Sequence, residues 1–175
     1  RSPRATFFCC FYMISSSLFA AAFAIFGISS RMLVFAMGWD NSVATQLYFL
    51  FLLLAVFFGI RAFFISKPES TFVQLFKSGA QASALFSIIV GGFTYVFYKF
   101  VDTTFFIGLI EARLDEARSK GYSLEDIEKM TGNLESVFSL VSYVPLTVFL
   151  FTLLGMSYSV VVAFIFRKVP LMRKA

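Results

Sequence analysis

The side chains that could do chemistry in this chain are the seven carboxylates between Glu111 and Glu135. Two carboxylates that converge on one substrate can serve as a general acid and a general base. In this segment their spacing is that of the solvated face of a helix, so we expect no catalytic pair. The chain contains no His, which removes the commonest general base and the commonest neutral metal ligand.

The two cysteines, Cys9 and Cys10, are adjacent in the sequence. Two neighbouring thiols without a third ligand make a poor metal site. We expect them to face lipid or to pack, and acylation of a membrane-proximal Cys is the alternative. The sequence also lacks a Gly-rich phosphate loop, a CxxC pair and a Ser/Lys constellation. We therefore predict that the protein is not an enzyme and has no catalytic residue, no cofactor and no metal.

Charged residues are distributed so that four long segments carry none. These segments lie between Arg4 and Arg31, Asp40 and Arg61, Lys77 and Lys99, and Glu135 and Arg167. Each meets the roughly 20 apolar residues that a helix needs to cross about 30 Å of hydrocarbon. Composition agrees, because 59% hydrophobic residues, 26 Phe and a mean hydropathy of +0.83 exceed what a soluble core could bury. We expect the Phe side chains mainly to face lipid.

The fold class predicted from these segments is an all-α, polytopic membrane protein with a single domain over residues 1–175. Four transmembrane helices are expected at about residues 6–30, 41–61, 77–99 and 143–167. A short extramembrane pair of helices is expected at about residues 103–133, between the third and fourth spans.

The distribution of charge over alternate loops predicts the orientation. One side carries nine basic residues against a single acid, Glu69, and the other side carries six basic and nine acidic residues. By the positive-inside rule both termini and the 61–77 loop are expected to be cytoplasmic, and the 99–135 segment periplasmic. These flanking charges also explain the basic pI of about 9.4, so we expect no nucleic-acid partner.

Five residues at the outer ends of the spans are expected to anchor them at the headgroup level. They are Trp39, Tyr95, Tyr98, Lys99 and Asp102. Amphipathic aromatic rings prefer the membrane interface, and Lys99 and Asp102 are close enough in sequence for a local ion pair. Filling of helix contacts is the alternative role for the aromatic residues.

Small residues recur along the third and fourth spans. They are Gly79, Ser83, Ser87 and Gly91 on the third, and Gly155, Ser159 and Ala163 on the fourth. Lipid gives helices no hydrophobic drive to meet, so close backbone approach at small residues supplies the contact. We predict that these two spans pack through these faces, with a docking face for another protein as the alternative.

Local signals predict the two helices of the outer segment. Thr103 or Thr104 can cap the first helix, and Gly121 suits the left-handed position after its end. Glu116 and Lys120 have the spacing of an i,i+4 ion pair.

The second helix of the outer segment is expected to begin at Ser123 and Asp126, which resemble a capping box, and to end at Gly132-Asn133. The uncharged segment that follows is too long for one crossing and contains Pro145, which removes a backbone donor. We expect a kink there, with the residues before Pro145 outside the membrane or tilted in its interface.

Three stretches resemble a known family: residues 72–79 leading into span three, residues 95–102 leaving it, and residues 123–130 before the last span. In combination they resemble a bacterial domain-of-unknown-function family. Its members are four-span proteins common in Bacteroidota-type bacteria, with a charged two-helix insert between spans three and four. The resemblance covers residues 58–168 and implies location in the bacterial cytoplasmic (inner) membrane. It implies no activity and no catalytic residues.

The function predicted from these features is that of an accessory or structural subunit, in contact with membrane lipids and packed on other integral membrane subunits. A coupled transporter has weak support, because the spans carry no buried charge. A small oligomeric pore or a transporter component is the alternative, and the candidate residues that would line the pore are Gln81, Ser83, Ser87 and Thr94. A tetraspanin-like organiser is excluded, because both cysteines lie in span one and cannot staple the outer segment.

Overall fold

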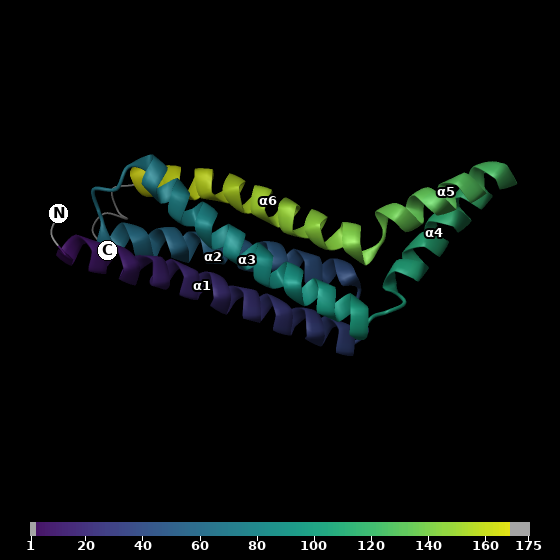
Figure 1. Ribbon diagram of the computed structural model, residues 1–175, viewed down its shortest axis with the longest axis horizontal. Coiled ribbons are helices and arrows are strands. Elements are labelled where there is room, and N and C mark those ends of the chain that lie inside the picture. Colours follow the sequence, from purple (N-terminus) through teal and green to yellow (C-terminus); the bar gives the residue numbers. More distant parts are fainter. Residues whose placement is uncertain (1–2, 169–175) are drawn as a thin grey trace. The chain divides into compact units, whose positions relative to one another are not determined.

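The computed structural model describes residues 3–168, with side chains described from residue 16 onward. Within this range the chain forms six helices and no strand (Figure 1). The helices are α1 (Pro3–Ala36), α2 (Asn41–Ser66), α3 (Phe72–Phe100), α4 (Phe105–Ser119), α5 (Leu124–Val137) and α6 (Leu140–Lys168). The predicted all-α class is confirmed. The side chains of Cys9 and Cys10 lie outside the described residues.

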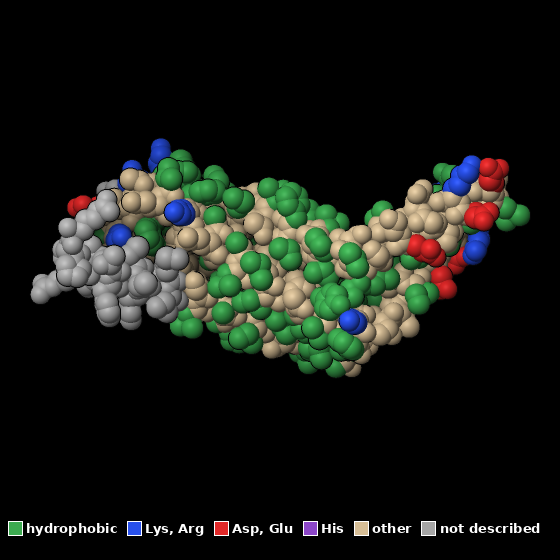
Figure 2. Space-filling model, in the orientation of Figure 1, with side chains coloured by type: hydrophobic (Ala, Val, Ile, Leu, Met, Phe, Trp, Pro, Cys, Tyr) green, Lys and Arg blue, Asp and Glu red, His purple; other side chains and the backbone are tan. Residues whose placement is uncertain are grey.

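Four helices are long and apolar enough to cross a membrane. They are Ser16–Ala36 of α1 and the whole of α2, α3 and α6. Their outward side chains are strongly apolar, and Leu18, Ile88 and Phe149 are each more than 60% exposed. Figure 2 shows such hydrophobic side chains spread over these helices, whereas the acidic side chains in view lie mainly on α4 and α5, and basic side chains lie there and near the α2–α3 connection. Because so much exposed apolar surface is unfavourable in water, the four predicted spans are confirmed as candidate membrane helices.

Contacts within the chain group its residues into two units. Unit one holds α1, α2, α3 up to Val90 and α6 from Val148, and unit two holds residues 91–147. Unit two therefore contains the end of α3, the insert helices α4 and α5, and the start of α6. The single domain predicted over residues 1–175 stays a prediction.

Phenylalanine rings join the helices of unit one. Phe23 of α1 stacks on Phe58 of α2 with ring centroids 5.6 Å apart. Phe166 of α6 lies 5.5 Å from both Phe57 and Phe64 of α2. Stacked and edge-on ring pairs are favourable beyond the area they bury. Many Phe side chains thus pack between helices, and lipid-facing rings account for only part of the Phe content.

The insert of unit two is a helical hairpin in which α4 and α5 lie side by side (Figure 1). Leu114 and Ala117 of α4 are its buried residues. Gly121 has φ +79° in the turn, as predicted for the residue after a helix end. Ser123 Oγ accepts a hydrogen bond from the N–H of Asp126 at 3.2 Å, so the predicted start of α5 is confirmed.

Two boundaries near the insert differ from the prediction. Helix α5 does not end at Gly132-Asn133 but continues to Val137, because Gly132 keeps a negative φ and does not terminate the helix. The break falls at Ser139, whose Oγ accepts from the N–H of Ser142 at 3.3 Å. Helix α6 therefore begins before Pro145, which lies inside it.

The start of α4 also differs in detail from the prediction. Thr104 is the residue before the helix, but its side chain makes no cap hydrogen bond. Its backbone carbonyl accepts from the N–H of Gly108 at 3.0 Å, which is the first helical bond. The position of the cap was predictable and its side-chain bond was not.

Candidate functional site

The small residues of α3 and α6 meet at the centre of unit one. A Cβ added to Gly79 of α3 would lie 2.5 Å from Ser159 Oγ of α6 and 2.7 Å from Ile60 Cδ1 of α2. A Cβ added to Gly155 of α6 would overlap the Cβ of Ser83 of α3. Neither position has room for a side chain, so α3 and α6 approach closely at two successive levels.

The serines of this contact bond to carbonyls of their own helices. Ser83 Oγ donates to the carbonyl of Ala80 at 2.9 Å, and Ser87 Oγ donates to the carbonyl of Ser83 at 2.7 Å. Ser159 Oγ donates to the carbonyl of Gly155 at 2.7 Å. A hydroxyl that pairs within its own turn has used its only donor. These serines therefore fill space as small side chains and offer no donor to a ligand.

The remaining predicted packing residues are buried as well. Ala163 of α6 is 0% exposed and belongs to the core of unit one. Gly91 is buried in α3, at the first residue of unit two. Because these small residues are covered by the chain's own helices, their faces are not open to another protein. The contacts of Gly79 with Ser159 and of Ser83 with Gly155 are therefore intramolecular.

Helix α2 also enters this contact, which sequence reasoning missed. A Cβ added to Gly59 would lie 3.1 Å from the Cβ of Ala82 of α3 and 3.7 Å from the Cβ of Ser16 of α1. The carbonyl of Gly59 accepts a hydrogen bond from Ser78 Oγ at 3.3 Å. The signal was present in the sequence, because Gly59 is the only glycine of α2 and stands between the bulky residues Phe58 and Ile60.

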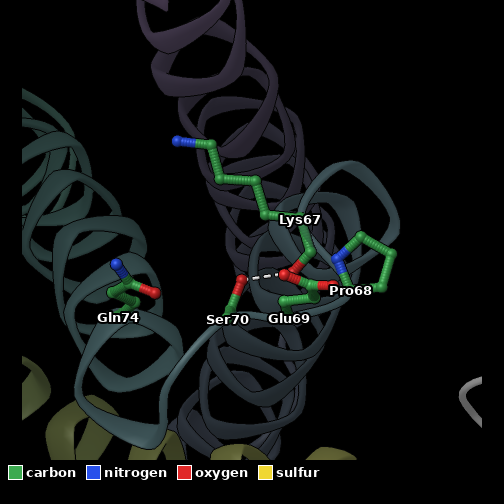
Figure 3. Close-up of a pocket in the computed structure, with 5 residues that line it drawn as sticks. All are labelled: Lys67, Pro68, Glu69, Ser70 and Gln74. Atoms are coloured by element: carbon green, nitrogen blue, oxygen red, sulfur yellow. Dashed lines mark hydrogen bonds between the residues drawn. The ribbon is translucent and has the colours of Figure 1, made fainter.

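The connection between α2 and α3 is closed by local hydrogen bonds (Figure 3). Ser70 Oγ donates to the carbonyl of Lys67. The N–H of Thr71 donates to Gln74 Oε1 at 2.9 Å, and the N–H of Gln74 donates to Thr71 Oγ1 at 3.4 Å. This reciprocal pair is a capping box at the start of α3, and its T-x-x-Q spacing could have predicted it.

A shallow, open hollow of about 450 Å³ lies beside this connection (Figure 3). Its lining residues are Lys67, Pro68, Glu69, Ser70 and Gln74. One cation and one carboxylate leave no excess charge to select an ion. Ser70 Oγ and Gln74 Oε1 already take part in local hydrogen bonds, so we assign no ligand to the hollow.

The end of α6 is tied to the same connection. Arg167 Nη1 donates to the carbonyl of Ser70 at 3.2 Å. Ser70 is 2% exposed, so this bond satisfies a carbonyl in a covered stretch of backbone. The bond joins residues 97 positions apart, which no local pattern could have indicated.

Arg31 lies inside α1 and is 5% exposed, whereas the sequence placed it in the connection after the first span. The helix continues to Ala36 because its last turns are apolar, and the connection turns at Gly38, which has φ +65°. Arg31 Nη1 donates to Oδ1 of Asn41 at 2.6 Å. A covered guanidinium needs such acceptors, so this contact links the end of α1 to the start of α2.

The predicted interface anchors divide into two kinds. Trp39 and Tyr95 are 53% and 40% exposed, and their role as anchors at the headgroup level stays a prediction. Lys99 Nζ donates to Tyr95 Oη at 3.0 Å and does not pair with Asp102, which was the wrong expectation. Lys99 and Tyr95 are one turn apart on α3, whereas Asp102 follows the end of that helix at Phe100.

Tyr98, the other predicted anchor, belongs to a cluster of four rings in unit two. Its centroid lies 4.5 Å from that of Phe105, 5.2 Å from that of Phe106 and 5.7 Å from that of Tyr143. All four rings are half-buried. The cluster joins the end of α3 to the starts of α4 and α6, so Tyr98 fills a helix contact, the alternative role considered for these aromatics.

The charged side chains of the insert pair along each helix. Lys120 Nζ lies 2.7 Å from Glu116 Oε1, which confirms the predicted ion pair. The hydrogen bond from Lys120, with a second from Arg113, lowers the pKa of Glu116 below its ordinary value of 4.5. The hydrogen bond to Glu116 raises the pKa of Lys120 above its ordinary value of 10.5.

Among residues 16–168 no three His, Cys, Asp or Glu side chains converge as metal ligands would.

These features define a multi-pass membrane protein with a charged helical insert. The chain belongs to the family described as Protein of unknown function (DUF4199), whose model matches residues 16–168. The match includes α1 and thus begins earlier than the region 58–168 that carries the resemblance seen in the sequence. No curated protein and no solved structure matches the chain.

Proposed function

We propose that this protein is a non-enzymatic accessory or structural subunit that packs on a larger membrane protein complex. The observation that carries this proposal is the turn of the insert, where Leu124 and Tyr122 are 87% and 51% exposed. Apolar side chains on the membrane helices can face lipid, but these two stand on a charged hairpin. Exposed apolar residues in a polar setting are typical of a protein contact.

The charge around this turn indicates the kind of partner. Four ion pairs engage the basic residues Arg113, Arg118, Lys120 and Lys129 of the insert. Four carboxylates of the insert lie outside those pairs and leave the hairpin acidic: Glu111, Asp126, Glu128 and Glu135. An apolar pocket rimmed by basic side chains would complement this surface.

The location that we propose is the bacterial cytoplasmic membrane, with both termini in the cytoplasm and the 99–135 segment in the periplasm. The excess of nine basic residues over one acid on the cytoplasmic side supports this orientation. The partner surface would then lie in the periplasm, and lipid would cover the outward faces of the four spans.

The test is gentle affinity purification of the tagged protein from native membranes, with mass spectrometry of stoichiometric companions. A Tyr122→Ser, Leu124→Asp variant should lose a companion that binds through the turn. The matched control is Ile107→Asp, which changes another exposed apolar residue of the insert, 58% exposed, near the opposite end of α4. Recovery of the wild-type protein alone, as a monomer or homo-oligomer, would count against the proposal.

The geometry does not favour the alternative of a small oligomeric pore. A pore lining requires its polar residues to share a free face, yet Ser83 and Ser87 are 0% exposed and Thr94 is 8% exposed. Only Gln81 of the four candidates is exposed. Single-channel conductance from the pure protein in a bilayer would restore that alternative.

A further inference from the structure

Gln81 is a primary amide on the outer surface of α3, one of the four membrane spans. It lies between Gly79 and Ser83, the two residues at which α3 meets α6, and one turn beyond Lys77. Its side chain is exposed and hydrogen-bonds to none of the described residues. The amide is therefore presented outward from the packed part of the helix.

Two exposed hydroxyl side chains of the spans, by contrast, form hydrogen bonds to carbonyls of their own helix. Ser157 Oγ donates to the carbonyl of Leu153 at 3.1 Å, and Thr45 Oγ1 donates to the carbonyl of Asn41 at 3.1 Å. A glutamine amide has two donor hydrogens and an acceptor oxygen. Lipid supplies no partner for them, and an unmade hydrogen bond in an apolar medium is unfavourable.

We propose that Gln81 pairs with Gln81 of a second copy of this chain, in a parallel contact of α3 with α3. A primary amide is both donor and acceptor, so two copies related by a two-fold axis along the membrane normal satisfy each other with two reciprocal hydrogen bonds. Such a contact is isologous and closes as a dimer. Amide pairs of this kind drive the association of membrane helices.

The neighbours of Gln81 on the same face of α3 fit this contact. Ile88, two turns away, is 61% exposed and supplies apolar surface. Ala84, half-buried, is small enough to let the second helix approach. Lys77 lies on the headgroup side of Gln81, and its long stem carries the ammonium to the interface, away from its symmetry mate. This dimer contact is independent of the accessory-subunit proposal, because it uses α3 and leaves the insert free.

The experiment measures self-association of the full chain in liposomes by energy transfer between labelled copies, over a range of protein-to-lipid ratios. We expect Gln81→Leu to weaken association roughly 3- to 30-fold. Leu at a lipid-facing position of a membrane helix should not impair folding. Gln46→Leu is the matched control, because Gln46 is also exposed and on a span but lies at the outer end of α2. It should associate as the wild type does.

A cross-linking experiment tests whether the contact between copies lies on α3. In a Cys9→Ser, Cys10→Ser background, Ile88→Cys should form a disulfide between copies when copper phenanthroline oxidises the two thiols. Phe149→Cys, on the exposed face of α6 at 62%, should not. A chain that stays monomeric at every ratio, or a dimer that Gln81→Leu leaves unchanged, would overturn the proposal. The second result would mean that the amide reaches interfacial water instead.

Discussion

Gly155 of α6 faces Ser83 of α3 so closely that a Cβ on the glycine would overlap the Cβ of the serine. The pair Gly79 and Ser159 repeats the arrangement with the two residue types exchanged between the helices. On each helix the glycine and the serine are four residues apart, close to one turn, so the antiparallel helices stay in register over both levels. Each glycine thus accommodates the serine opposite.

We predict that Gly155→Leu destabilises the folded chain by about 1 to 3 kcal/mol or more, because the added side chain must displace Ser83 or move α6. The measurement is the unfolding free energy in detergent, by SDS titration. Gly92→Leu is the control, because nothing lies within 4 Å of a Cβ added at Gly92. Equal losses for Gly155→Leu and Gly92→Leu would contradict the close approach.

Arg31 and Asn41 should be energetically coupled. Arg31→Met keeps much of the side-chain volume but removes the donor to Asn41 Oδ1, and Asn41→Ala removes the acceptor. A double-mutant cycle is expected to give a coupling of about 0.5 to 3 kcal/mol. Single-variant losses that simply add would show that the bond contributes nothing to the α1–α2 contact.

The capping box at the start of α3 should contribute measurably to stability. Thr71→Ala is expected to lower the unfolding free energy by about 0.5 to 2 kcal/mol, because it removes the side-chain acceptor Oγ1 and leaves the N–H of Gln74 only the backbone carbonyl of Thr71. Val73→Ala, at a 68% exposed neighbouring position, is the control and should lose less. A smaller effect from Thr71→Ala than from Val73→Ala would argue against the cap.

The pair of Glu116 and Lys120 should make the stability of α4 depend on pH. The hydrogen bond from Lys120 lowers the pKa of Glu116 below its ordinary value of 4.5. The ionised Glu116 therefore stabilises the folded helix at pH values above 4.5, and this stabilisation is lost as the pH falls through the lowered pKa. The pKa of Lys120 is raised above its ordinary value of 10.5, so the charged Lys120 stabilises the folded helix at pH values below 10.5. This stabilisation is lost as the pH rises through the raised pKa.

Amide hydrogen exchange of the full chain in nanodiscs checks this pH dependence. Protection of α4 should fall from neutral pH to acid, and Glu116→Gln should remove most of that change. The control is Glu111→Gln, which alters a carboxylate outside the four ion pairs of the insert. If Glu111→Gln flattened the profile as strongly as Glu116→Gln, the pair would not be the cause.

The proposed orientation can be tested with single cysteines in a Cys9→Ser, Cys10→Ser chain. Gly132→Cys lies on the exposed surface of α5, and Glu69→Cys lies in the connection between α2 and α3. An impermeant maleimide should label the first in intact spheroplasts and the second only after lysis. The reverse order of labelling would invert the topology.

Local patterns in the sequence were sufficient to predict the helices and several of their ends. The charge-free segments indicated the four spans because an unpaired charge in hydrocarbon is costly. Gly121 and Ser123 indicated the turn of the insert because their effects act within a few residues. The same local reasoning failed at Gly132, where a glycine stays in the helix.

The three-dimensional arrangement alone decided which helix faces meet. That Gly59 approaches Ala82, that Arg31 is covered inside α1 and that Arg167 binds the carbonyl of Ser70 all depend on contacts between distant parts of the chain. The period of small residues showed which faces could pack closely but not that the chain's own helices would fill them. Whether a helix is stable in hydrocarbon depends on its own apolar composition. Which helices pack together depends on how well two surfaces fit each other, and that fit cannot be read from either helix alone.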